Sequence, residues 1–203
     1  MITDFQVRSL DAPGGWSTNH RRYYDYAEQS LVELEEAAAS VIAAWPKDAP
    51  DILARDDLPS GVHELCRRRD RLSDATKLFA AMAAESFINC YGVVRLGEDQ
   101  FNRHVERLPV TRKLQLLLLV CDSVVASEGD ELIAALDHLV QRRNRLAHPK
   151  SRPVELGAVP DTLRGSPVPE DARGTVAALR RFYELFQAAV PASSRLIPEH
   201  RVA

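Results

Sequence analysis

With 203 residues, the chain has the length of one domain with a substantial core. Apolar residues make up 45% and charged residues 27%, which excludes a disordered chain, and the net charge of −3 excludes a general nucleic-acid coat or a membrane-surface protein. Three widely spaced cysteines without CxxC or Cys/His spacing exclude a disulfide framework and a zinc site, and they predict buried, reduced thiols.

The N-terminus lacks a basic region followed by an apolar stretch, so it does not resemble a secretory signal. The most apolar run, residues 114–121, is too short to span a bilayer. We therefore expect a cytoplasmic protein without a membrane partner.

In chain order, residues 1–18 are expected to be an extended segment. Apolar residues then recur at spacings of three and four from Tyr24 to Trp45, which predicts an amphipathic helix that Pro46 and Pro50 should end.

A second and longer helix is predicted after the loop at residues 59–61. Its apolar positions include a seven-residue repeat at Leu65, Leu72, Phe79 and Ser86. The helix is expected to end at Asn89 or Tyr91, with Gly92 and Gly97 at its exit.

The rest of the chain continues the helical periodicity, with helices expected at about 98–108, 111–123, 128–147 and 170–190. Pro149 should stop the helix at 128–147, because the residue before a proline disfavours the α region. Residues 151–174 are a long Pro- and Gly-rich connection, which we interpret as a mobile or functional loop, and residues 191–203 are expected to be a flexible tail. The predicted class is all-α, a single bundle at residues 19–190 with about four long helices plus short ones.

Polar residues interrupt apolar stripes on two of these helices. On the helix at 128–147, Arg143 occupies one position of a stripe that otherwise consists of Leu132, Leu136, Leu139 and Leu146. On the second helix, Glu85 and Asn89 share a stripe with Leu78 and Met82, and they are one turn apart, so they can contact each other. A buried carboxylate and a buried guanidinium each need a partner, so we expect Glu85 to hold Arg143. The alternatives are that Arg143 extends to solvent at the helix end and that Glu85 faces solvent.

The end of the same helix carries a titratable group and a local excess of positive charge. His148 lies one turn beyond Asn144, which can orient the imidazole ring, and a helix C-terminus favours imidazolium. The alternative is a histidine that only caps the helix. Between Leu139 and Pro153 the charged residues are all basic, which favours phosphate binding: Arg142, Arg143, Arg145, Lys150 and Arg152. A second basic cluster at residues 67–71 is interpreted as a solvated face.

Three motifs in order resemble the HEPN superfamily (higher eukaryotes and prokaryotes nucleotide-binding domains). Arg143-Asn144-x-x-x-His148 resembles its Arg-x4–6-His motif, and residues 82–89 (MAAESFIN) are similar to the Ala-x-Glu-x-x-x-Asn motif on the first core helix of several families. Residues 108–114 (LPVTRKL) resemble the segment that usually follows, with Arg112 where an acidic residue often precedes the lysine. The resemblance covers roughly residues 60–150, and the last helix would close the HEPN-like core at about residue 190.

The resemblance implies a symmetric homodimer with a shared cleft between the two motif helices and, as in many members, a metal-independent endoribonuclease. The RNA 2′-hydroxyl would attack the adjacent phosphorus, with histidine transferring protons and arginine stabilising the developing charge. No metal or cofactor is expected. The assigned roles are catalytic for Arg143, His148 and Asn144, supporting for Glu85 and Asn89, and RNA-binding for Arg142, Arg145 and Lys150.

The first candidate function is an RNA-cleaving dimer that acts as a toxin or in phage defence, with a protein antitoxin or another regulator as partner. Two other functions remain open. A non-catalytic HEPN-like dimer would bind a nucleotide or a protein, and the weak overall basicity favours it, since RNA affinity depends on many phosphate contacts. A purely structural bundle is the third. The intact Arg-Asn-x-x-x-His pattern favours the nuclease, because a scaffold has no need of a titratable group at that position.

Overall fold

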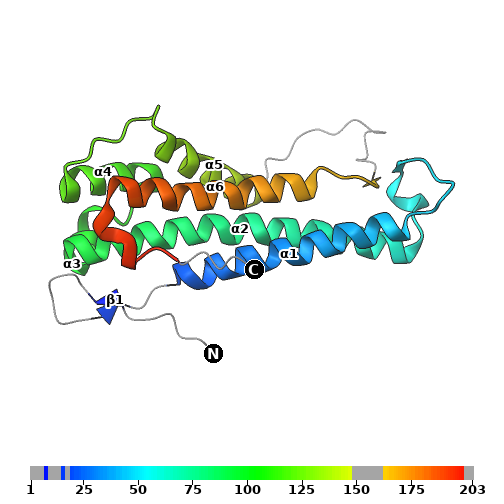
Figure 1. Ribbon diagram of the computed structural model, residues 1–203, viewed down its shortest axis with the longest axis horizontal. Coiled ribbons are helices and arrows are strands. Elements are labelled where there is room, and N and C mark those ends of the chain that lie inside the picture. Colours follow the sequence, from blue (N-terminus) through cyan, green and yellow to red (C-terminus); the bar gives the residue numbers. More distant parts are fainter. Residues whose placement is uncertain (1–6, 9–14, 17–18, 148–161, 199–203) are drawn as a thin grey trace.

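The computed structural model describes residues 7–8, 15–16, 19–147 and 162–198, and nearly all regular structure within them is helical (Figure 1). The helices are α1 (His20–Ala44), α2 (Ser60–Leu96), α3 (Glu98–His104), α4 (Val110–Asp122), α5 (Glu131–Ala147) and α6 (Val168–Ala189). Two-residue strands form antiparallel pairs, β1 (Val7–Arg8) with β2 (Gly15–Trp16) and β3 (Ile52–Leu53) with β4 (Thr162–Leu163). The predicted all-α class is confirmed. In this part of the chain, no helix is both long and apolar enough to cross a membrane.

Three long helices, α1, α2 and α6, lie along the long axis of the molecule, and α3 and α4 gather at one end (Figure 1). Helix α1 packs along α2, and α5 packs against both α2 and α6. The predicted end of α1 is confirmed. Trp45 is extended, with φ −63° and ψ 136°, as expected for the residue before Pro46.

Helix α2 continues beyond its predicted end at Asn89 or Tyr91 and stops at Gly97, which has a φ of +80°. Gly92 does not mark the exit but lies buried within the helix. A Cβ at this position would come within 2.5 Å of ring carbons of Phe101, so only glycine lets this ring approach the α2 backbone.

Helices α3, α4 and α5 follow the predicted order with small shifts at their ends. α3 ends at His104 rather than near Leu108. α4 begins directly after Pro109 and ends before Ser123, whose left-handed φ of 57° stops the helix. A hydrogen bond from Thr111 Oγ1 to Asp137 Oδ1 (2.5 Å) joins α4 to α5.

The C-terminal part is more structured than a loop and a flexible tail. α6 begins at Val168, within the segment expected to be a connection, and β4 precedes it. Beyond α6, Pro191–Arg195 form a short 3₁₀ helix, η2. Leu196 is buried, and its carbonyl oxygen lies 2.6 Å from His20 Nε2. Residues 191–198 therefore pack onto the bundle, which differs from the expected tail.

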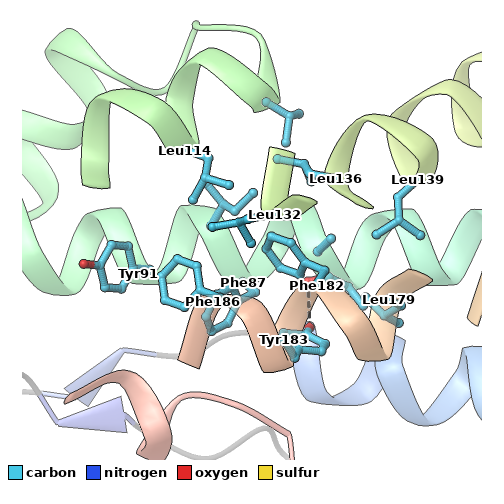
Figure 2. Packing of buried hydrophobic residues seen from close by; sticks show 14 of the residues in the cluster. Phe87, Tyr91, Leu114, Leu132, Leu136, Leu139, Leu179, Phe182, Tyr183 and Phe186 are labelled. Atoms are coloured by element: carbon cyan, nitrogen blue, oxygen red, sulfur yellow. Dashed lines mark hydrogen bonds between the residues drawn. The ribbon is translucent and has the colours of Figure 1, made fainter. Parts of the chain in front are cut away.

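Aromatic side chains from α2 and α6 form the centre of the core (Figure 2). The Phe87 and Phe186 rings meet edge to face with centroids 4.8 Å apart, and the Tyr91 ring contacts Phe186 in the same way at 4.9 Å. The α5 residues Leu132, Ile133, Leu136 and Leu139 cover this cluster. Each of these buried side chains contributes about 1.5–3 kcal/mol relative to an exposed position.

The buried face of α2 differs from the predicted repeat. Leu65, Leu72, Phe79 and Ser86 are only partly buried. The buried stripe lies one residue later in the sequence, at Cys66, Ser73, Ala80 and Phe87. Its first three side chains are smaller than those of the predicted repeat. Arg69 is also buried, beside Asp70, so the interpretation of residues 67–71 as a solvated face is wrong for that arginine. The predicted burial of the cysteines is confirmed for Cys66 and Cys90, whereas Cys121 is half-buried.

Candidate functional site

The apolar stripe of α5 ends in a charged pair with α2. Leu132, Leu136 and Leu139 are buried, and one turn later Arg143 points to α2, where its Nη1 donates to Glu85 Oε2. The expected ion pair between Glu85 and Arg143 is therefore formed. Both side chains stay partly accessible, with 26% of Arg143 and 32% of Glu85 exposed. The pair lies at the surface of the bundle, where a ligand can reach it.

Asn144 occupies a second side of the same guanidinium. Its Oδ1 accepts from Arg143 Nε at 3.3 Å and from Nη2 at 3.1 Å. A guanidinium has five N–H donors, and the contacts with the described residues use three of them. Within the described part of the chain, two donors of Arg143, one on Nη1 and one on Nη2, have no acceptor, and guanidinium N–H groups suit the oxygens of a phosphate.

Asn89 lies one turn from Glu85 on α2, which suggested a contact between them. In the described structure no hydrogen bond joins these two side chains. Asn89 Oδ1 instead accepts from Lys113 Nζ at 2.7 Å. Lys113 lies in the first turn of α4 and is only 3% exposed. Burial lowers the pKa of this lysine, while the negative charges of Glu85 and Glu106 act to raise it.

Sequence reasoning missed Lys113 as a member of this site. The pattern that reveals it is the helical spacing of Val110, Lys113, Leu114 and Leu117, which puts the lysine on the buried face of α4. A cation on a buried stripe needs anionic or polar partners, just as Arg143 does.

The predicted RNA-binding residues have different environments. Arg142 Nη1 forms an ion pair with Asp171 Oδ1 on α6 at 2.6 Å, and Lys77 Nζ lies 2.8 Å from the other oxygen, Oδ2, of the same carboxylate. Burial acts to raise the pKa of Asp171, but the hydrogen bond from Lys77 and the charges of both cations hold this pKa below its usual value. Arg145 is exposed. His148 and Lys150 lie outside the described residues, so the position of the proposed catalytic histidine stays a prediction.

His138 is a second polar residue that the sequence did not single out. It precedes Arg142 by one turn of α5, and its buried Nε2 has no hydrogen-bond partner among the described residues. Desolvation and the nearby positive charge of Arg142 lower its pKa, so this ring is neutral near pH 7.

Two surface hollows lie elsewhere along α6. One, of about 320 Å³, is lined by residues that include Tyr24 and Arg180, and the other, of about 450 Å³, by residues that include Arg69 and Arg164. Neither includes the Glu85–Arg143 pair. In the described part of the chain, no group of three or more His, Cys, Asp or Glu side chains has the arrangement of a metal site.

Comparison with known proteins gives no match, whether to a family model, a curated protein or a solved structure. We therefore infer the function from the residues of α2, α4 and α5.

Proposed function

We propose that this chain is a metal-independent endoribonuclease whose site is centred on Arg143 and His148. The observation that carries the proposal is the state of Arg143. Glu85 and Asn144 fix its guanidinium at the surface, and two of its donors have no acceptor among the described residues. In the sequence, His148 follows five residues later.

The proposed reaction uses the RNA substrate as its own nucleophile. The 2′-hydroxyl attacks the adjacent phosphorus, the bond to the 5′-oxygen of the next nucleotide breaks, and a 2′,3′-cyclic phosphate remains. His148 removes the proton from the 2′-hydroxyl or supplies one to the leaving oxygen, and Arg143 stabilises the charge that develops on the phosphorane. Asn144 positions the arginine.

The proposed machinery of one chain contains one histidine, His148, and the reaction needs both an acid and a base. We therefore propose a symmetric homodimer in which the α5 ends of two copies form one cleft and the two His148 side chains divide these roles. A toxin or a phage-defence nuclease is the biological role that we propose, in the cytoplasm, with RNA as substrate and a protein antitoxin or other regulator as partner.

A non-catalytic binding module is the alternative, and one observation favours it. Arg142 and Arg143 both form ion pairs within the chain, with Asp171 and Glu85. Each internal pair reduces the positive charge that is available to RNA, whose affinity depends on phosphate neutralisation. Such a site suits one phosphate group of a nucleotide better than a long strand.

The deciding experiment is RNA cleavage in EDTA with wild-type protein and the variants His148→Ala, Arg143→Ala and Arg181→Ala. Arg181 is a matched control, because it is a surface arginine with an ion pair to Glu131 at the other end of α5. We expect His148→Ala to lower the rate by about 10²–10⁴-fold and Arg143→Ala by about 10²–10³-fold, with Arg181→Ala near wild type. Products should carry 2′,3′-cyclic phosphate ends.

Cleavage that both site variants leave unchanged would remove the nuclease assignment. Sedimentation of the wild-type protein is the second test, because a strict monomer is incompatible with a shared cleft. Nucleotide binding without cleavage, lost in Arg143→Ala, would establish the alternative.

A further inference from the structure

Lys113 is the most deeply buried lysine among the described residues, and it lies beside the proposed site without being part of its predicted machinery. We infer that Lys113 is a positioning residue of the Arg143 site: its ammonium shares the charge of Glu85 with Arg143 and thereby keeps the guanidinium able to bind a phosphate group. This inference deepens the proposed function and specifies the ligand group that the site accepts.

The partners of Lys113 show that its charge is balanced within the site. Asn89 Oδ1 accepts its hydrogen bond at 2.7 Å, and the Phe101 ring centroid lies 5.7 Å from Nζ. An amide and a ring solvate an ammonium but do not neutralise it, and an unbalanced buried charge is costly. Glu85 precedes Asn89 by one turn of α2, so its carboxylate lies on the same side of the helix as the amide that binds Lys113. Burial lowers the pKa of Lys113, and the negative charges of Glu85 and Glu106 act to raise it.

Glu85 is at the same time the ion-pair partner of Arg143, so the charge of one partly buried carboxylate acts on two cations, with a direct contact to Arg143 alone. The contact between Glu85 and Arg143 uses Nη1 alone rather than the bidentate arrangement of an isolated arginine–carboxylate pair. If Lys113 were neutral, Arg143 alone would balance Glu85, and the pair would have no net charge with which to attract an anion. Lys113 therefore keeps a positive charge at the exposed edge of the site.

Accessibility separates the roles of the two cations. Arg143 is 26% exposed and reaches solvent, whereas Lys113 is 3% exposed, on the buried face of α4 and near the Phe101 ring of α3. A bound phosphate would contact Arg143 and not Lys113. The lysine acts through Glu85 and Asn89, which is why we describe it as a positioning residue.

The test is a titration of the full-length protein with inorganic pyrophosphate, followed by NMR on the side-chain Nε–Hε resonance of Arg143. Wild type is compared with Lys113→Met, which removes the charge, and Lys113→Arg, which keeps it. Arg95→Met is the control, because Arg95 is a partly buried cation on α2 that is paired with Asp122 at the far end of α4. We expect Lys113→Met to weaken binding by about tenfold, the scale of one unit charge acting over several ångströms near a protein surface. Lys113→Arg should recover part of the affinity, and Arg95→Met should match wild type.

If Lys113→Met does not fold, Lys113→Gln gives the same comparison, because its amide can still donate to Asn89 while the charge is absent. Equal affinity in wild type and the neutral variants would overturn the inference, and so would a wild-type Arg143 resonance that pyrophosphate does not shift. RNA cleavage in EDTA on the same preparations separates the two proposals. Binding that depends on Lys113 without any cleavage supports the inference and removes the nuclease.

Discussion

The coupling energy of the Glu85–Arg143 pair can be measured with a double-mutant cycle, and its expected size follows from how exposed the two side chains are. The cycle compares wild type, Glu85→Ala, Arg143→Ala and the double variant. Fully exposed ion pairs contribute about 0.2–1 kcal/mol, whereas hydrogen bonds to charged groups in partly buried positions contribute about 1.5–3 kcal/mol. With 32% and 26% of the two side chains exposed, the pair lies between these limits. We expect a coupling energy of about 1–2 kcal/mol.

The assay is urea unfolding of all four proteins at one fixed protein concentration, because dimerisation would make stability depend on concentration. The contacts of Arg143 with Asn144 cancel in the cycle. The control cycle uses Arg112 and Glu128, which also join distant parts of the chain at 3.0 Å but are 62% and 76% exposed. Its coupling should be below about 0.5 kcal/mol. A Glu85–Arg143 coupling no larger than this control would refute the reasoning that α2 fixes the arginine.

Two further predictions concern stability. Gly92→Ala should destabilise the protein by about 1–2 kcal/mol in thermal or urea unfolding, because overpacking against Phe101 exceeds the gain in helix propensity. Gly174→Ala on α6 should stabilise the protein by about 0.5–1 kcal/mol, because the space around its Cβ position is open. Equal effects of the two substitutions would contradict the close approach at α3. Burial lowers the pKa of His20 from 6.5 to about 4. As the pH falls, the histidine is therefore protonated in the unfolded chain before it is protonated in the folded one, and about 3 kcal/mol of stability should be lost between pH 6.5 and 4. His20→Gln should show a shallower loss over this window, and parallel pH curves for the two proteins would rule out a neutral buried histidine beside Leu196.

The parts of the fold that the sequence predicted are those with local chemical causes. Pro46 and Pro109 set the end of α1 and the start of α4, because proline restricts its own backbone and that of the preceding residue. The end of α2 was missed because a glycine in a helical pattern can mark either a terminus or a close contact. Only the tertiary position of Phe101 shows that Gly92 belongs to the second kind.

The buried face of α2 could not be identified from large apolar residues alone. Several helices surround α2, so its most buried positions are filled by small side chains such as Ala80, Ala83 and Ala84, which let neighbouring helices approach. Small residues carry little signal in a hydrophobic pattern. The larger Leu72 and Phe79 form a clearer apolar repeat in the sequence than these alanines, although they are only partly buried.

The ion pair of the site could be predicted because two residues of opposite charge each interrupt an apolar stripe. Arg143 and Glu85 each interrupted an apolar stripe on a different helix, and one charge on a buried stripe is a reason to look for the opposite one. Asn89 gave no such constraint, because an amide can pair with many groups. Its contact with Lys113 depends on how α4 crosses α2, which local sequence does not determine.

Two consecutive arginines give the end of α5 a further property. Neighbouring residues on a helix point about 100° apart. Arg143 therefore reaches Glu85 on α2 while Arg142 reaches Asp171 on α6, so two different helices hold the last turns of α5. Helix termini fray unless side chains or neighbours constrain them. A terminus fixed on two sides is a rigid support for the residues that follow, which include His148. Proton transfer between a histidine and a phosphodiester depends on sub-ångström placement, so a rigid support at this point is what the proposed chemistry requires.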